Sequence, residues 1–222
     1  MKQNEFGRSM IEMLGVLAII WVLSVGGLAG YAKAIRQYKI NKTVEQITLI
    51  ATRVQTLFAS QRNYSDFGSG ATKIDLIKKA KIFPEETFTG SCAHNSGEPQ
   101  NGASNIFGGC IELYAWYLNG PDSPYGKTFI ISMHEIPEDI CVALLTYDWT
   151  SAFGDQLVAI GTDVDVEGAT ANCAGGYAHD STYFMCNGSE QWGIPLSLSK
   201  AITACGADCG ESGMCGLSFM FK

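Results

Sequence analysis

The chain has 222 residues, of which 46% are hydrophobic and 17% charged, a length that fits one ordinary domain or one domain plus an appendage. The apolar share excludes a disordered chain, and the net charge of −7 excludes nucleic-acid binding through an overall basic surface. The charge is split along the chain. Residues 1–81 carry 12 Lys/Arg and 5 Asp/Glu, a net of +7, and residues 82–222 carry 3 and 17, a net of −14. Two different parts are therefore joined end to end.

An uncharged segment, residues 13–32, dominates the first part. As an α-helix it would be about 30 Å long, the thickness of the hydrocarbon core of a bilayer. Three interpretations compete: a cleaved secretory signal, a plain membrane anchor, and an anchor with a further role. A secretory signal has an apolar region of only about 7–15 residues. The segment is too long for that, although Ala32-Lys33-Ala34 imitates a cleavage site.

Glu12 distinguishes the two remaining interpretations. It lies at the edge of the apolar segment, where a carboxylate costs free energy, needs a partner and usually marks a function. A plain anchor has no use for it. Gly7, just before this stretch, and the continuation of the helical pattern beyond membrane length also favour an anchor with a further role.

The residues that follow predict an amphipathic continuation of the same helix, residues 33–62. No proline occurs before Pro84, so one helix of about 50 residues is expected. Because each glycine destabilises a helix interior by about 1 kcal/mol, bending or local melting is expected at Gly26, Gly27 and Gly30. Apolar residues recur at steps of four and three, as on one face of a helix: Ile40, Val44, Ile47, Ala51, Val54 and Phe58.

Residues 7–14, GRSMIEML, resemble the prepilin processing site of type IV pilins. In that family a prepilin peptidase cuts after the glycine, the new amino terminus is methylated, and the glutamate helps dock the subunit into the fibre. The resemblance implies a leader of residues 1–7, cleavage between Gly7 and Arg8, and a transmembrane and fibre-core helix of residues 8–32. Glu12 would pair with the terminal amine of a neighbouring subunit. Arg8, where many pilins have Phe, and Trp21 depart from the family pattern.

Two signals of membrane orientation disagree. The positive-inside rule places the four basic residues after the apolar segment in the cytosol. The cysteines argue for export, because disulfides are rare in the cytosol, and we give them the greater weight. The basic residues are Lys33, Arg36, Lys39 and Lys42.

The eight cysteines form a dense, even-numbered set, which is typical of a disulfide framework in an exported domain. Zinc sites usually combine close cysteine pairs with nearby histidines. Here only the steps from Cys205 to Cys209 and from Cys209 to Cys215 are short, so disulfides are favoured over zinc ligands or free core thiols. Spacing leaves the pairing open. The set is Cys92, Cys110, Cys141, Cys173, Cys186, Cys205, Cys209 and Cys215.

The second part predicts mixed α and β structure. Residues 93–104 read as a polar loop. Helices are expected at residues 73–81 and from Pro137 through residue 144, where acidic residues suit the first turn. Strands are expected in a hairpin and in three later segments. The hairpin is residues 111–118 and 128–133, and the later strands are residues 157–160, 164–166 and 216–221.

The order of these elements is similar to that of type IV pilins of the b subclass and their minor-pilin relatives. The similarity covers about half of the head and includes residues 105–109, NIFGG. In such pilins the cysteine of the central helix pairs with one just before the last strand. This implies that Cys141 pairs with Cys205, Cys209 or Cys215 and that the other two pair together. The simplest remaining pairs are then Cys92–Cys110 and Cys173–Cys186.

An acidic segment offers one weak candidate for a metal site. Asp163, Asp165 and Glu167, followed by Gly168, resemble the start of a calcium loop. The bidentate acid expected six residues later is absent, since position 174 is Ala. An acidic turn between strands is the favoured interpretation.

No enzyme motif stands out, and no cofactor is expected. The sequence has no phosphate-binding loop, no nucleophile elbow and no C-x-x-C redox pair. The three histidines read as ordinary surface or part-buried residues. Glycan binding by an exposed Trp149 or Trp192 has no support in the sequence.

The sequence therefore predicts an α+β protein with the type IV pilin fold, a long amino-terminal helix packed on an antiparallel sheet in a disulfide-bonded head, residues 63–222. The predicted function is a structural, non-enzymatic subunit of a type IV pilus. Its expected partners are copies of itself or related pilins, a prepilin peptidase, an inner-membrane assembly platform and, before assembly, the bilayer. The alternatives are a minor pilin, a pseudopilin of type II secretion in the periplasm, and a membrane-anchored exported adhesin that does not polymerise.

Overall fold

The computed structural model divides the chain into two compact units, Met1–Lys39 and Ile40–Lys222. The described part of the first unit is helical, and the second unit combines helices and strands, so the chain has the α+β set of elements that the sequence predicted. The structure describes residues 6–61, 63–68, 73–93, 99–100, 102–117, 125–162, 177–179, 182–186 and 193–222.

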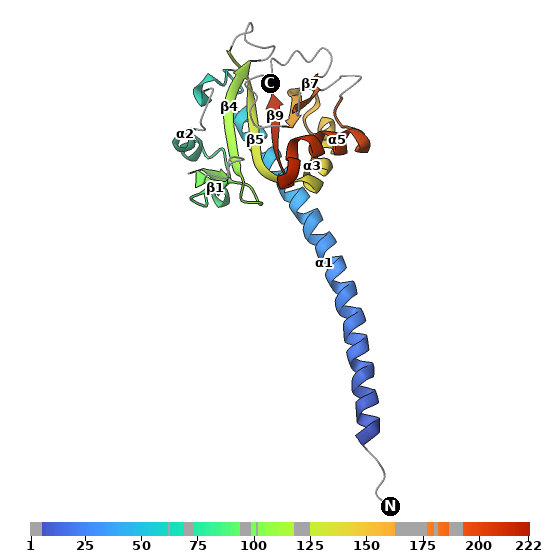
Figure 1. Ribbon diagram of the computed structural model, residues 1–222. Helices are drawn as coiled ribbons and strands as arrows, with labels where there is room; N and C mark the ends of the chain where they lie inside the picture. Colours follow the sequence, from blue (N-terminus) through green and yellow to red (C-terminus); the bar gives the residue numbers. More distant parts are fainter. Residues whose placement is uncertain are drawn as a thin grey trace, which may run out of the picture. The chain divides into compact units, whose positions relative to one another are not determined.

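Helix α1, Phe6–Leu57, contributes residues to both units and is the longest element of the chain (Figure 1). It is helical through Gly26, Gly27 and Gly30, so the expected local melting is absent. It ends before residue 62, with turns at residues 58–61. The other helices are α2 (Ile74–Lys79), α3 (Glu138–Leu145), α4 (Trp149–Phe153) and α5 (Leu198–Cys209), with short 3-10 turns at Ser65–Phe67, Glu85–Thr87, Gly154–Gln156 and Gly210–Ser212.

The head of the second unit is built on an antiparallel sheet. In the described part its seven strands run in the order β3-β4-β5-β9-β6-β8-β7, so the last strand along the chain lies in the middle. The predicted hairpin is present as the pair β4 and β5. The strands are β3 (Ala103–Ser104), β4 (Cys110–Tyr117), β5 (Tyr125–Pro137), β6 (Leu157–Thr162), β7 (Tyr177–His179), β8 (Thr182–Cys186) and β9 (Met214–Phe221), and β1 (Cys92–Ala93) pairs separately with β2 (Pro99–Gln100).

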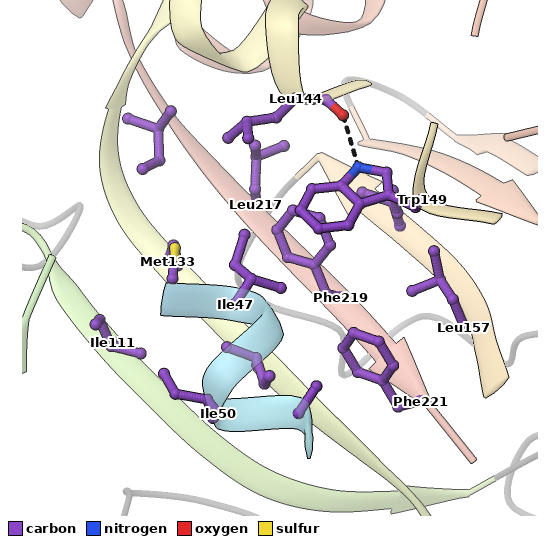
Figure 2. Packing of buried hydrophobic residues seen from close by; sticks show 14 of the residues in the cluster. Ile47, Ile50, Ile111, Met133, Leu144, Trp149, Leu157, Leu217, Phe219 and Phe221 are labelled. Atoms are coloured by element: carbon purple, nitrogen blue, oxygen red, sulfur yellow. Dashed lines mark hydrogen bonds between the residues drawn. The ribbon is translucent and has the colours of Figure 1, made fainter. Parts of the chain in front are cut away.

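The main core lies between the second half of α1 and one face of this sheet (Figure 2). Ile47 and Ile50 of α1 are fully buried, as are Phe219 and Phe221 of β9. Of the six residues in the predicted helix stripe, all but Val44 are buried. Full burial of one such side chain contributes about 1.5–3 kcal/mol, so this face of α1 fixes the helix on the sheet.

Helices α3 and α4 close one side of the core. Glu138 and Asp139 occupy the first turn of α3, where the helix dipole favours acidic side chains. Trp149 at the start of α4 is fully buried and donates a hydrogen bond from Nε1 to the Leu144 carbonyl oxygen, 2.8 Å away (Figure 2). Its burial excludes the exposed glycan-binding role considered for Trp149.

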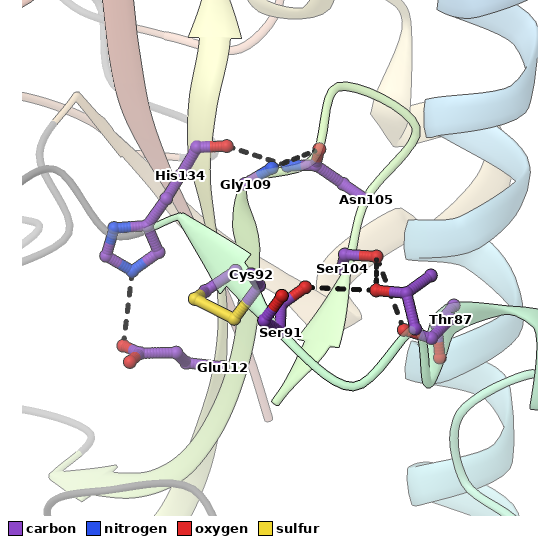
Figure 3. Close-up of a disulfide and its surroundings, with 10 residues drawn as sticks. Thr87, Ser91, Cys92, Ser104, Asn105, Gly109, Glu112 and His134 are labelled. Carbon is purple, nitrogen blue, oxygen red and sulfur yellow. Dashed lines mark hydrogen bonds and ion pairs between the residues drawn. A yellow bond between two sulfur atoms is a disulfide. The ribbon is translucent and has the colours of Figure 1, made fainter. Parts of the chain in front are cut away.

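The turn at residues 105–109 is held by a buried asparagine (Figure 3). Asn105 donates from Nδ2 to the His134 carbonyl oxygen at 2.7 Å, and its Oδ1 accepts from the Phe107 and Gly109 amides. A Cβ on Gly109 would lie 1.9 Å from the same His134 oxygen. The motif NIFGG therefore serves a close approach of this turn to β5, where the register shifts between Met133 and Ile136.

Several details differ from the sequence prediction. Residues 93–104, read as a loop, contain parts of three short strands. Helices α4 and α5 and strands β7 and β8 were not predicted. The strand expected at residues 164–166 lies outside the described residues. Elsewhere α2, α3, β6 and β9 fall where helices and strands were expected.

Candidate assembly surface and disulfide frame

The first half of α1 exposes an unbroken apolar surface. Fourteen large apolar side chains between Met10 and Tyr31 are more than half exposed, including Met10 at 70% and Trp21 at 73%. Burying each of them would contribute about 1.5–3 kcal/mol, roughly 20 kcal/mol or more in total. A surface of this size needs a bilayer or other apolar helices to cover it.

Length and composition allow this helix to cross a membrane. Among the described residues, Met10–Leu57 is the one segment that meets both conditions, and the protein buries none of its most apolar window. A helix at the centre of a soluble domain would be covered by its own chain. The bilayer-length segment predicted from the sequence therefore presents its side chains outward.

The three residues predicted for processing and assembly lie in the first two turns of α1. The backbone of Gly7 and Arg8 is helical, so the predicted cleavage site lies inside α1. Glu12 is exposed one turn further along, between the exposed apolar residues Ile11 and Met13. The structure thus places a carboxylate within the apolar surface, at its amino-terminal edge.

Four glycines of α1 have no packing role within the described part of the chain. A Cβ at Gly15, Gly26, Gly27 or Gly30 would meet no atom within 4 Å. Small residues on a membrane helix allow a second helix to approach closely. Since no described residue of this chain is such a neighbour, these positions are available to helices of other molecules.

Three disulfides stabilise the described part of the head. Cys92–Cys110 links β1 to β4, and Cys141–Cys205 links α3 to α5. Cys209–Cys215 links the end of α5 to β9. The resemblance implied the first of these pairs, and it left three partners open for Cys141, of which the structure selects Cys205. In the predicted pair Cys173–Cys186, Cys173 lies outside the described residues, and the side chain of Cys186 is not described.

Two further expectations from the sequence concern the acidic segment and the histidines. Asp163, Asp165 and Glu167 lie outside the described residues, so the structure gives no account of the calcium candidate. His134, expected at or near the surface, is fully buried on β5, with Nε2 3.3 Å from Glu112 Oε2 on β4 (Figure 3). The expectation for His134 was wrong, because a partner carboxylate on the adjacent strand allows an imidazole to be buried.

Comparison with a protein-family model gives the family to which this chain belongs. The model of the PilS N-terminal family matches residues 37–187, more than half of the chain. The chain belongs to the PilS N-terminal family. This membership confirms the resemblance to type IV pilins that residues 7–14 indicated. The long amino-terminal helix, antiparallel sheet and disulfides of this PilS-family chain agree with the predicted pilin fold.

The solved structures that are similar to the PilS-family chain include two type IV pilins. The type IV b pilin from Salmonella typhi is 16% identical, with a TM-score of 0.45, and the match covers 82% of this chain and 97% of that chain. TcpA, a type IV pilin from Vibrio cholerae El Tor biotype, is 13% identical, with a TM-score of 0.48 and coverage of 83% and 99%. No curated protein matches the chain.

Sequence reasoning missed one feature of the frame, the gathering of four cysteines where α3, α5 and β9 meet. The sulfur atoms of Cys141, Cys209 and Cys215 lie within 4.8 Å of one another, and Cys205 is bonded to the first. The short steps between Cys205, Cys209 and Cys215 were visible in the sequence. The position of Cys141 beside them depends on the tertiary fold.

Proposed function

We propose that this chain is the precursor of a subunit that assembles into a type IV pilus through residues 8–32. The proposal rests on the uncovered apolar surface of α1, Met10 to Tyr31, with Glu12 at its edge. Before assembly the bilayer covers this surface. After a prepilin peptidase cuts between Gly7 and Arg8, the same surface packs against the helices of other subunits in the fibre.

The physical account of assembly is an exchange of apolar environments. Contact with lipid is replaced by contact with apolar helices, so the transfer loses little hydrophobic stabilisation. Glu12 supplies the interaction that fixes how neighbouring helices are aligned. Its carboxylate, costly among apolar side chains, pairs with the terminal amine of Arg8 in a neighbouring subunit, and this pairing sets the register between helices.

The disulfides support an exported head. Three disulfides within the described residues of one small domain are typical of an oxidising compartment. The basic residues beginning at Lys33 give the opposite orientation signal, but whole domains are translocated largely regardless of charge. The precursor is therefore assigned to the inner membrane with the head outside the cytosol, and the assembled form to the extracellular fibre.

Mass spectrometry of the mature protein tests processing. We expect an amino terminus at Arg8, with or without methylation. An amino terminus at Met1 or near Lys33 would contradict the proposal and return the chain to a plain anchor or a cleaved signal.

Electron microscopy of fibres tests the role of Glu12. We expect Glu12→Val to abolish fibres while the mature amino terminus and the amount of membrane-inserted protein stay unchanged. Glu12→Gln, which keeps the shape and removes the charge, should also reduce fibre yield. Glu45→Gln, which removes a carboxylate on the second half of α1 paired with Lys42, is the matched control. Normal fibre yield in both Glu12 variants would refute the pairing.

A further inference from the structure

Two neighbouring disulfides share one buried sulfur cluster in the head. Cys141–Cys205 and Cys209–Cys215 are separate bonds, yet the sulfurs of Cys141, Cys209 and Cys215 lie within 4.8 Å of one another. All four residues are at most 3% exposed. A thiol freed at one bond therefore lies beside the other bond and is shielded from competing solutes.

Hydrogen bonds keep the cluster together without the covalent links. The Gly216 amide donates to Asp208 Oδ2 at 2.9 Å, which ties β9 to the end of α5. Ser212 Oγ donates to the Cys209 carbonyl oxygen at 2.8 Å. The Glu138 amide donates to the Gly213 carbonyl oxygen at 3.1 Å, which ties the start of α3 to the same turn. Loss of one disulfide therefore leaves the sulfur atoms near each other.

We propose that these four cysteines form an intramolecular thiol–disulfide exchange relay. In this relay, a thiol released by reduction of Cys209–Cys215 attacks the Cys141–Cys205 disulfide and opens it in turn. The starting point is the bond next to the turn Gly210–Ser212, whose residues are exposed. Cys141 and Cys205 have no exposed surface at all. Reduction that begins at the turn thus reaches a bond that a reductant cannot contact directly.

The chemistry balances with a dithiol as the reductant. One thiolate of the dithiol attacks Cys209 or Cys215, its second thiol resolves the mixed disulfide, and two electrons pass to the protein. A thiolate at Cys215 then attacks the sulfur of Cys141. The Cys141–Cys215 bond forms, the Cys141–Cys205 bond breaks, and Cys205 leaves as a thiolate that takes up a proton. This second step consumes no electrons, because it exchanges one disulfide for another.

The relay changes which elements are joined. In the structure, Cys141–Cys205 links α3 to α5. After exchange, Cys141–Cys215 links α3 to β9 instead, and α5 is held by packing and hydrogen bonds alone. Exchange at Cys209 gives the related isomer with Cys141–Cys209. The head thereby has alternative cross-links that it reaches by side-chain movements without unfolding.

Single-cysteine variants of the full chain in detergent micelles test the relay. Cys209→Ser leaves Cys215 without its partner, beside Cys141. The variant is incubated near pH 8.5, the ordinary pKa of a thiol, quenched with acid and alkylated in denaturant, so that buried thiols also react. We expect label on Cys205 as well as on Cys215. If the pairings Cys141–Cys205 and Cys141–Cys215 have equal free energies, Cys215 and Cys205 should each carry about half of the label. In the converse variant, Cys205→Ser, label should appear on Cys209 or Cys215 besides Cys141.

Cys110→Ser is the matched control, because it frees one thiol, Cys92, from the disulfide between β1 and β4. All of its label should stay on Cys92. Label confined to Cys215 in the first variant and to Cys141 in the second would overturn the relay.

Partial reduction of the unaltered chain decides the case if a variant fails to fold. Limited dithiothreitol, an acid quench and fragment-ion mapping should show molecules with two labels in which one label is on Cys205 and the other on Cys209 or Cys215. Doubly labelled molecules that carry only the pair Cys209 and Cys215, or only the pair Cys141 and Cys205, would refute exchange.

Discussion

The disulfides of the head should contribute unequally to the free energy of unfolding, in an order set by the length of the loop that each one closes. In the chain-entropy treatment, a cross-link removes about 2.1 + 1.5R ln n cal/mol/K from the unfolded state, where n is the loop length. The sequence separations are 64 for Cys141–Cys205, 18 for Cys92–Cys110 and 6 for Cys209–Cys215. At 25 °C these correspond to about 4.3, 3.2 and 2.2 kcal/mol.

The difference in unfolding free energy between two disulfide variants can be predicted more closely than the loss caused by either variant. All six cysteines are at most 4% exposed, so replacing a pair with two alanines removes similar buried volume in each case, and the packing loss largely cancels. The free energy of unfolding should therefore fall most for Cys141→Ala/Cys205→Ala and least for Cys209→Ala/Cys215→Ala, with a difference of about 2 kcal/mol. Double replacement leaves no thiol at the altered pair, which keeps disulfide exchange out of the measurement.

Urea unfolding of the full chain in detergent micelles, followed by tryptophan fluorescence, measures these differences. Trp149 reports on the head because it is fully buried and packs against Phe219 of β9. The comparison requires equal slopes of free energy against urea among the variants, since an altered slope would mean a changed unfolded state. If loss of the short Cys209–Cys215 link costs as much as loss of Cys141–Cys205, loop entropy does not set the order.

Two further predictions concern single residues of the head. Gly109→Ala should destabilise the protein by at least about 3 kcal/mol in the same urea assay, because its Cβ would lie 1.9 Å from the His134 carbonyl oxygen. Gly108→Ala, at a φ of +90° with no atom within 4 Å of the new Cβ, should cost only about 1–2 kcal/mol, and equal costs would refute the close-contact argument. Hydrogen bonds from Ser151 and Thr150 lower the pKa of Asp148 below its ordinary 3.8. Because the folded-state pKa is the lower one, its stabilisation is present above pH 3.8 and lost as the pH falls through the folded value. Asp148→Ala should therefore destabilise the chain at neutral pH and progressively less below pH 3.8. Asp155→Ala is the control. A loss of stability in Asp148→Ala that does not change with pH, or an equal loss in Asp155→Ala, would contradict this account.

The elements that the sequence predicted correctly are those whose local pattern agrees with their final burial. In the second half of α1, Ile47, Ala51 and Val54 recur at helical steps, and the structure buries all three. The hairpin of β4 and β5 is rich in β-branched and aromatic residues, and the terminal strand β9 is rich in large apolar ones. In each element, side chains that carry the pattern are buried in the core.

Helix α5 shows why other elements escaped prediction. Its buried face is made of small residues, Ala201, Ala204 and Cys205, whereas the large apolar residues Leu198 and Ile202 are 63% and 50% exposed. A pattern based on large apolar residues therefore marks the wrong face of the helix. Small residues allow α5 to approach α3 closely, and this approach is what the Cys141–Cys205 bond requires. Since neither the packing nor the pairing is a local property, the sequence left both open.

The position of β9 connects the fold to the order in which the head can form. This strand lies between β5 and β6, so without it the sheet is two separate halves. It also carries Cys215, whose sulfur joins the cluster beside Cys141. Contacts between segments so distant in sequence form late, because the loop between them must close first. The central strand and the place of Cys215 beside Cys141 therefore depend on one late step. The proposed relay therefore requires β9 to be docked, because until then Cys215 has no fixed position beside Cys141.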